Sequence, residues 1–128
     1  MSIEDILLRL GITANYRGYF YLISAVELCL ADRENLHLVT KYVYPKVAKL
    51  YHTNWRAVER NIRTVGKLAW THHRAFLEEL ARGPLGQRPG NAKLLAILTT
   101  ALSPSRDRPP RDFAYSPGPG GIKIASMF

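Results

Sequence analysis

Four cationic residues recur at helical spacing in the middle of this 128-residue chain. Arg56, Arg60, Arg63 and Lys67 are separated by four, three and four residues. On an α-helix this spacing places all four side chains on one face. Arginine can donate two hydrogen bonds to O6 and N7 of guanine, and both residue types attract phosphates. The pattern predicts a helix that either reads DNA bases or presents a solvated basic face.

The polar residues beside these cations have two roles open to them. Glu59 can accept a hydrogen bond from a cytosine amino group, or it can pair with Arg63 one helical turn later. Thr53 and Asn54 can contact a phosphate, but capping of the following helix explains them equally well.

Charge is distributed unevenly along the chain. Residues 1–40 carry three Lys and Arg against five Asp and Glu, whereas residues 41–74 carry eight against one. Lys41, Lys46 and Lys49 belong to this basic segment and are expected to attract phosphates or simply to be solvated. Such a local excess of positive charge is typical of proteins that bind nucleic acids.

Two amphipathic helices are predicted to position the cations. The helix over about residues 54–70 has one apolar face made of Trp55, Val58, Ile62, Val65 and Ala69, with Trp55 expected to cover the edge of the core. Pro45 is expected to begin a shorter helix over residues 45–51, because proline fits the first helical position. Its inward residues are expected to be Val47, Ala48 and Tyr51, with Ala48 as the small residue where the helices cross. His52 falls in the turn, where many helix-turn-helix motifs carry glycine.

Further helices are predicted over residues 3–10, 19–31, about 36–42, 74–81 and 91–102. Ser2 and Asn91 are expected to be N-caps, and Gly11 is expected to end the first helix. The segment 19–31 is apolar around most of its circumference, which predicts a central position. No segment has a convincing strand pattern. The chain is therefore predicted to be all-α, a compact bundle of about six helices with a central helix-turn-helix.

The composition divides the chain near its end and excludes several function classes. Residues 1–102 are expected to form one DNA-binding domain, and the Pro/Gly-rich residues 103–128 a flexible tail. Cys29 is the only cysteine and is expected to fill the core. His72 and His73 point about 100° apart on a helix, which disfavours metal chelation. With no membrane span, signal peptide or catalytic motif, we expect a cytoplasmic protein that is not an enzyme and needs no cofactor or metal.

Several motifs resemble one known family. They are KYVYPKVAK at 41–49, VERNIR at 58–63 and Ala69-Trp70, together with IEDIL at 3–7, Leu10-Gly11, Gly18-Tyr19, Tyr21-Leu22, VTK at 39–41, Pro89 and Asn91. In this combination and order, residues 2–102 resemble the DNA-binding effector domain of the sporulation-initiation response regulator of endospore-forming bacteria.

The resemblance implies an all-helical domain that reads a short DNA box and regulates transcription. By position, Glu59, Arg60 and Arg63 match residues of the family's recognition helix. It also implies binding of double-stranded DNA as tandem homodimers, and contact with RNA polymerase sigma factors through the stretch after Trp70. That stretch is rich in histidine here and differs from the usual family pattern.

Two departures from the family pattern bear on function. The family usually has Ser-Arg before Val-Glu-Arg, whereas this chain has Arg56-Ala57, so either Arg56 compensates or the DNA box differs. Family members normally carry an N-terminal receiver domain, so this chain is expected to be either a fragment or a stand-alone protein. The alternative function is a protein-interaction module that pairs with a full-length regulator or with RNA polymerase, without sequence-specific DNA binding of its own.

Overall fold

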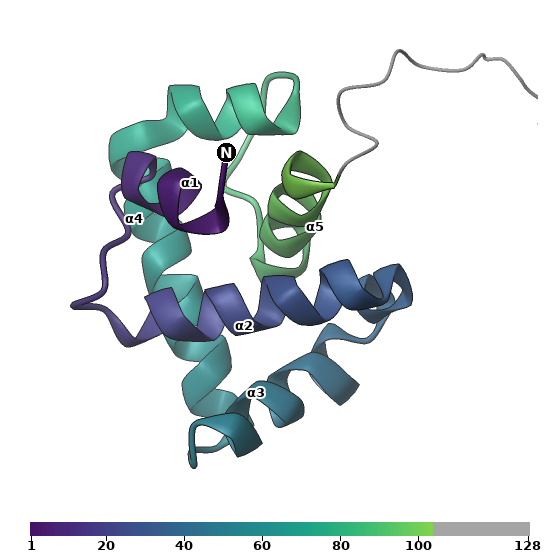
Figure 1. Ribbon diagram of the computed structural model, residues 1–128. Helices are drawn as coiled ribbons and strands as arrows, with labels where there is room; N and C mark the ends of the chain where they lie inside the picture. Colours follow the sequence, from purple (N-terminus) through teal and green to yellow (C-terminus); the bar gives the residue numbers. More distant parts are fainter. Residues whose placement is uncertain (104–128) are drawn as a thin grey trace, which may run out of the picture.

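A computed structural model describes residues 1–103 of the chain, and these residues form a compact bundle of helices without strands (Figure 1). The elements are α1 (Ile3–Arg9), α2 (Arg17–Ala31), the 3₁₀ helix η1 (Arg33–His37), the π-helix η2 (Val39–Val43), α3 (Tyr44–Leu50), α4 (Trp55–Ala81) and α5 (Asn91–Leu102). The predicted all-α class is confirmed. The expected flexible tail lies outside the described residues, except for Ser103.

Helix α1 begins and ends as predicted. The Ser2 hydroxyl accepts a hydrogen bond from the Asp5 amide at 3.1 Å, and the Asp5 carboxylate accepts one from the Ser2 amide at 3.2 Å. The hydrogen bond from the Ser2 amide stabilises the carboxylate and is the main cause that lowers the pKa of Asp5. Gly11 follows the helix with a φ of 79°, which glycine adopts at no steric cost.

The prediction of an α-helix over about residues 36–42 is wrong, because a 3₁₀ helix and a π-helix occupy this segment. Asp32 caps a 3₁₀ helix that begins earlier, accepting a hydrogen bond from the Glu34 amide at 3.0 Å. A π-helix, η2, then leads directly into α3. In a regular α-helix, Pro45 would offer no N–H to the Lys41 carbonyl and its ring would crowd that oxygen. A widened turn before the proline accommodates the ring.

Helix α2 lies at the centre of the bundle, as predicted. Leu22, Ala25, Val26 and Cys29 are fully buried, and the helix contacts α3, α4 and α5. In Figure 1, α2 runs across α4 and above α3. Gly18 marks the closest approach to α4, because a Cβ at this position would overlap the carbonyl oxygen of Asn61. This contact fixes the distance between the central helix and the predicted recognition helix.

Helix α4 is long but divided. His73 has non-helical dihedral angles, with φ −138° and ψ 37°, and the axis changes direction there. In Figure 1 the second part of α4 crosses the top of the molecule, whereas the first part descends behind α2. The sequence predicted two helical stretches here, and the kink separates them.

In the described part of the chain, no helix is long and apolar enough to cross a membrane.

Candidate nucleic-acid interface

Helices α3 and α4 share a packed core beneath the cationic face. Val47, Val58 and Ile62 are fully buried, and Ala48 is 4% exposed. The small side chain of Ala48 agrees with its predicted position between the two helices. Val65 and Ala69 continue the buried stripe along α4. The inner face of α4 is therefore held in the bundle, and its outer face is available to solvent.

The turn between these helices is tight and supported by backbone hydrogen bonds. The Thr53 amide donates to the Ala48 carbonyl at 2.9 Å, and His52 has a φ of 55°. A residue with a Cβ is strained in this left-handed conformation, so the histidine occupies a position that suits glycine. Asn54 is the N-cap of α4, and its side chain accepts a hydrogen bond from the Ala57 amide at 2.9 Å. Of the two candidates for the cap, Asn54 fills the role.

Two aromatic residues lie at the edge of this core: Trp55, as expected, and Tyr51, which was expected to point inward. Tyr51 is 39% exposed, and its ring contacts Tyr21 edge-on with 5.2 Å between the centroids. Its hydroxyl lies 2.8 Å from that of Ser24. Trp55 is 40% exposed. Both residues lie next to the turn, where the core between α3 and α4 ends, so each ring is buried on one side only.

The predicted cations share the outer face of α4 but differ in their partners. The side chains of Arg60 and Lys67 are exposed and make no hydrogen bond or ion pair within residues 1–103. Arg63 forms an ion pair with Glu59, one helical turn earlier. The guanidinium of Arg56 lies over the indole of Trp55, 5.1 Å from the ring centroid.

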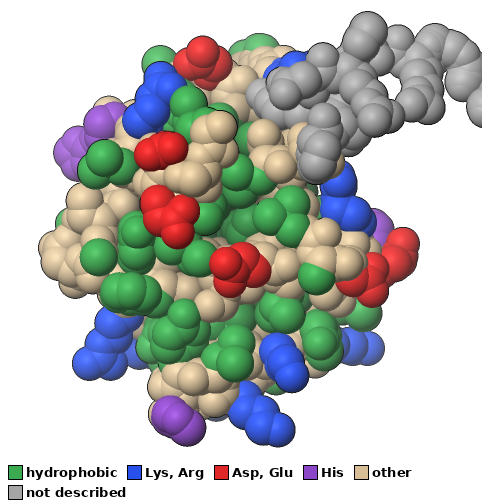
Figure 2. All heavy atoms as spheres, in the orientation of Figure 1, with side chains coloured by type: hydrophobic (Ala, Val, Ile, Leu, Met, Phe, Trp, Pro, Cys, Tyr) green, Lys and Arg blue, Asp and Glu red, His purple; other side chains and the backbone are tan. Residues whose placement is uncertain are grey.

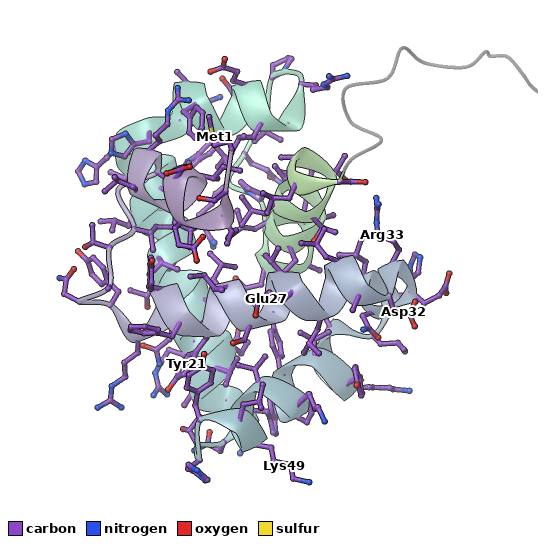
Figure 3. All side chains as sticks on the ribbon, viewed as in Figure 1. Met1, Tyr21, Glu27, Asp32, Arg33 and Lys49 are labelled. Atoms are coloured by element: carbon purple, nitrogen blue, oxygen red, sulfur yellow. The ribbon has the colours of Figure 1, made fainter. Side chains whose placement is uncertain are left out.

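Lysines Lys46 and Lys49 lie exposed on α3. Figure 3 shows Lys49 at the lower edge of the molecule, away from Glu27 on α2 and from Asp32, which follows α2. In Figure 2 the Asp and Glu side chains lie in the upper and middle parts of the view. The lower part of this view, over α3, shows Lys and Arg side chains and no Asp or Glu. The uneven charge of the sequence therefore becomes an uneven charge of the surface.

A surface groove of about 620 Å³ flanks the start of α4. One wall is formed by Trp55, Glu59 and Arg63, and the opposite wall by Arg88 and residues 90–93, with Thr40 and Tyr44 completing the lining. Sequence reasoning missed Arg88 and Lys93, because they lie far from the basic segment along the chain. Only the packing of α5 against α4 brings them beside the recognition face.

Asn91 does not cap α5 as predicted. Gly90 occupies the N-cap position, and the side-chain Nδ2 of Asn91 donates instead to the Tyr44 hydroxyl at 3.1 Å and to the Glu59 carbonyl at 2.9 Å. Burial raises the pKa of Tyr44, although the hydrogen bond from Asn91 opposes the shift. An asparagine before an apolar helix fits a cap equally well in sequence, and its tertiary partners lie 47 and 32 residues away.

Beyond the kink, the charged side chains of α4 serve the fold. The Arg74 guanidinium packs over the Trp70 ring, with its Cζ 4.3 Å from the ring centroid, and donates a hydrogen bond to the Leu85 carbonyl at 2.8 Å. Glu78 accepts from the Leu85 amide at 2.8 Å, which lowers the pKa of its carboxyl, with a smaller contribution from Arg74. His72 and His73 are exposed, and within residues 1–103 no three His, Cys, Asp or Glu side chains gather to hold a metal.

Comparison with known families agrees with this geometry. Residues 3–102 match the family model described as the C-terminal domain of sporulation initiation factor Spo0A. The match covers the helices from α1 to α5, including the cationic face of α4 and the groove beside it. This is a family of DNA-binding regulatory domains in sporulation and not an enzyme family. The chain therefore belongs to the Spo0A C-terminal domain family of DNA-binding transcription regulators.

Proposed function

We propose that α3, the turn and α4 form a helix-turn-helix that binds a specific box in double-stranded DNA. Residues 54–70 would occupy the major groove, with the buried stripe of α4 held against the bundle. The observation that carries this proposal is the contrast between the two faces of α4: Ile62 is fully buried, whereas Arg60 is exposed and lacks a partner within residues 1–103. Exposed arginine on such a helix is suited to base readout.

The proposed contacts fall into two groups. Arg60 and Arg63 read base edges, with Glu59 holding the Arg63 guanidinium in place through their ion pair. Glu59 can also accept from a cytosine when Arg63 moves to a base. Arg56 lies one turn before Arg60 and reaches the first bases of the box, once it leaves the indole of Trp55.

Phosphate contacts position the domain and come from residues around the reading face. Lys46 and Lys49 on α3, Thr53 and Asn54 in the turn, and Lys67 farther along α4 supply them. These interactions are salt-dependent and carry no sequence information directly. Asn54 can serve both as cap and as contact, since its amide nitrogen is not used in the cap hydrogen bond.

The two groups are tested separately by measuring binding to random duplex and to a box selected from a pool of random duplexes, called the selected box. We expect Arg60→Ala to lose about 1–3 kcal/mol on the box and to relax specificity at one base pair. Lys49→Ala should weaken binding to all sequences alike and reduce the salt slope by about 1. Unchanged discrimination in Arg60→Ala would show that this recognition-helix assignment is wrong.

The family resemblance also supports two finer proposals on partners. Two copies would bind tandem boxes side by side, and the part of α4 after Trp70 would contact a sigma factor of RNA polymerase. Sedimentation with duplexes of one and two boxes tests the first proposal. Steep salt dependence with no preference among sequences would favour the interaction-module alternative instead.

A further inference from the structure

The groove between α4 and α5 lies directly beside the proposed reading face. Trp55, Glu59 and Arg63 line it at successive spacings of four residues, so they form one stripe along α4. Arg60 lies on the next stripe of the same helix, one residue from Glu59. A DNA strand that borders the major groove around α4 would therefore pass along this groove.

The charge of the groove suits a phosphate backbone. Its charged lining consists of Arg63, Arg88 and Lys93 against the single carboxylate of Glu59, which already pairs with Arg63. The side chains of Arg88 and Lys93 make no hydrogen bond or ion pair within residues 1–103, so the fold does not use their charges. Two cations on the wall opposite α4 are left to neutralise a ligand.

The floor of the groove is fixed by hydrogen bonds. Asn91 lies between Arg88 and Lys93 in sequence and ties the start of α5 to Tyr44 and to the Glu59 carbonyl. The two cations are thus carried by a segment whose distance from α4 is set by the fold. A preformed wall lowers the ordering cost of each phosphate contact.

The opposite flank of α4 provides a comparison. A groove of about 280 Å³ there is lined by Tyr16, Thr64, Lys67, Leu68, Thr71 and His72, and Lys67 is its one permanently charged residue. The α5 side is therefore the more cationic of these two flanks. Charge and continuity with the reading face both favour a phosphate strand on the α5 side.

We propose that Arg88 and Lys93 form a phosphate clamp, which holds the DNA strand flanking the bases read by α4. This inference rests on the proposed function and adds residues outside the helix-turn-helix to the DNA interface. It assigns the groove to duplex DNA rather than to an acidic protein segment. The clamp contributes affinity on every sequence, because it contacts the backbone and not the base edges.

The test uses the full chain with Arg88→Ala, Lys93→Ala and the double variant, measured on the selected box and on random duplex at several salt concentrations. Each single variant should weaken both complexes by about threefold to tenfold and lower the salt slope by about 0.9. The ratio of the two affinities should stay unchanged. Arg33→Ala is the control, since Arg33 lies in η1 and donates to the Ser103 hydroxyl at the C-terminal end of α5, whereas the groove is lined by residues at the start of α5.

A neutral methylphosphonate placed at single phosphates around the box locates the contact. At one flanking position it should weaken wild-type binding and have no further effect on the double variant. The clamp is overturned if the double variant binds DNA as Arg33→Ala does, even if the groove accepts an acidic peptide. If the double variant binds like the control while Arg60→Ala still relaxes specificity, only the clamp is refuted. If Arg60→Ala leaves specificity unaltered, the reading face is refuted.

Discussion

The two parts of α4, before and after the kink at His73, use the same residue type in opposite ways. In residues 55–72, Arg60 projects from a helix whose other face is buried, and it has no partner within residues 1–103. In residues 74–81, Arg74 is held between Trp70, Glu78 and the Leu85 carbonyl. One arginine is left for a ligand, and the other anchors a loop.

This difference shows that position in the helix pattern does not by itself identify a functional arginine. Exposed ion pairs add little to stability, with a median of about 0–1 kcal/mol, so a cation without a partner costs the fold little. A bidentate contact to a base is worth about 1–3 kcal/mol of discrimination. The first part of α4 can therefore be optimised for DNA while the second part secures the connection to α5.

The largest expected effect comes from breaking the support of the first part. Gly18→Ala places a methyl group against the Asn61 carbonyl and 2.9 Å from Val65 Cγ1, so α2 and α4 must separate. We expect a loss of about 3 kcal/mol in the free energy of unfolding, measured with urea. Gly86→Ala is the control, because no atom lies within 4 Å of its added Cβ. Equal stability of the two variants would contradict the close approach.

Arg74→Ala sharpens the comparison from the other side of the kink. Loss of the hydrogen bond to Leu85 and of the contact with Trp70 should lower the free energy of unfolding by about 1 kcal/mol. DNA affinity and specificity should remain at wild-type values. Arg60→Ala should give the reciprocal result, with stability within about 0.5 kcal/mol of wild type and weaker DNA binding. The comparison fails if both variants change the same property.

The turn before α4 should tolerate, and gain from, glycine. His52 is held at a φ of 55°, which costs a residue with a Cβ about 1–2 kcal/mol, whereas glycine adds about 0.5–1 kcal/mol of unfolded-state entropy. His52→Gly should therefore raise the free energy of unfolding by about 0.5 kcal/mol. His52→Ala retains the strained backbone and should give no gain. Greater stability in the alanine variant would argue against strain at this position.

The smallest effect is the pH dependence of the loop anchor beyond the kink. The hydrogen bond from the Leu85 amide lowers the pKa of Glu78 in the folded state. A lowered folded pKa gives stability that is present above the unfolded pKa and is lost as pH falls through the folded value. Unfolding measured from about pH 6 to about pH 3 should show a shallower decline for Glu78→Gln than for wild type. Parallel curves would contradict a stabilised carboxylate.

Local sequence signals predicted the helices that have strong punctuation. The capping box of Ser2, the left-handed Gly11 and the inner stripe of α4 follow directly from residue type and spacing. The segment 33–43 was harder to predict, because a 3₁₀ turn and a widened π turn share the apolar spacing of a short α-helix. Pro45 indicates that the turn before it is irregular, because proline offers no N–H and its ring crowds the preceding turn.

The candidate site divides in the same way. The four cations of α4 could be placed on one face from sequence, since helical spacing is a local property. The groove could not, because Arg88 and Lys93 reach α4 only through the packing of α5. The Asn91 side chain can either cap α5 or bond to Tyr44 and Glu59, and the sequence alone does not show which interaction forms. Tyr51 continues the apolar register of α3 at the C-terminal end of that helix, where burial depends on neighbours outside the helix.

Selection of bound duplexes from a random pool, carried out with the full chain and with Arg60→Ala, tests the central claim most directly. The account predicts that the wild-type protein enriches one short box, and that Arg60→Ala enriches the same box with one base pair relaxed. Arg74→Ala should reproduce the wild-type box. A wild-type selection with no enriched sequence, or an identical box from Arg60→Ala, would contradict base reading by the first part of α4.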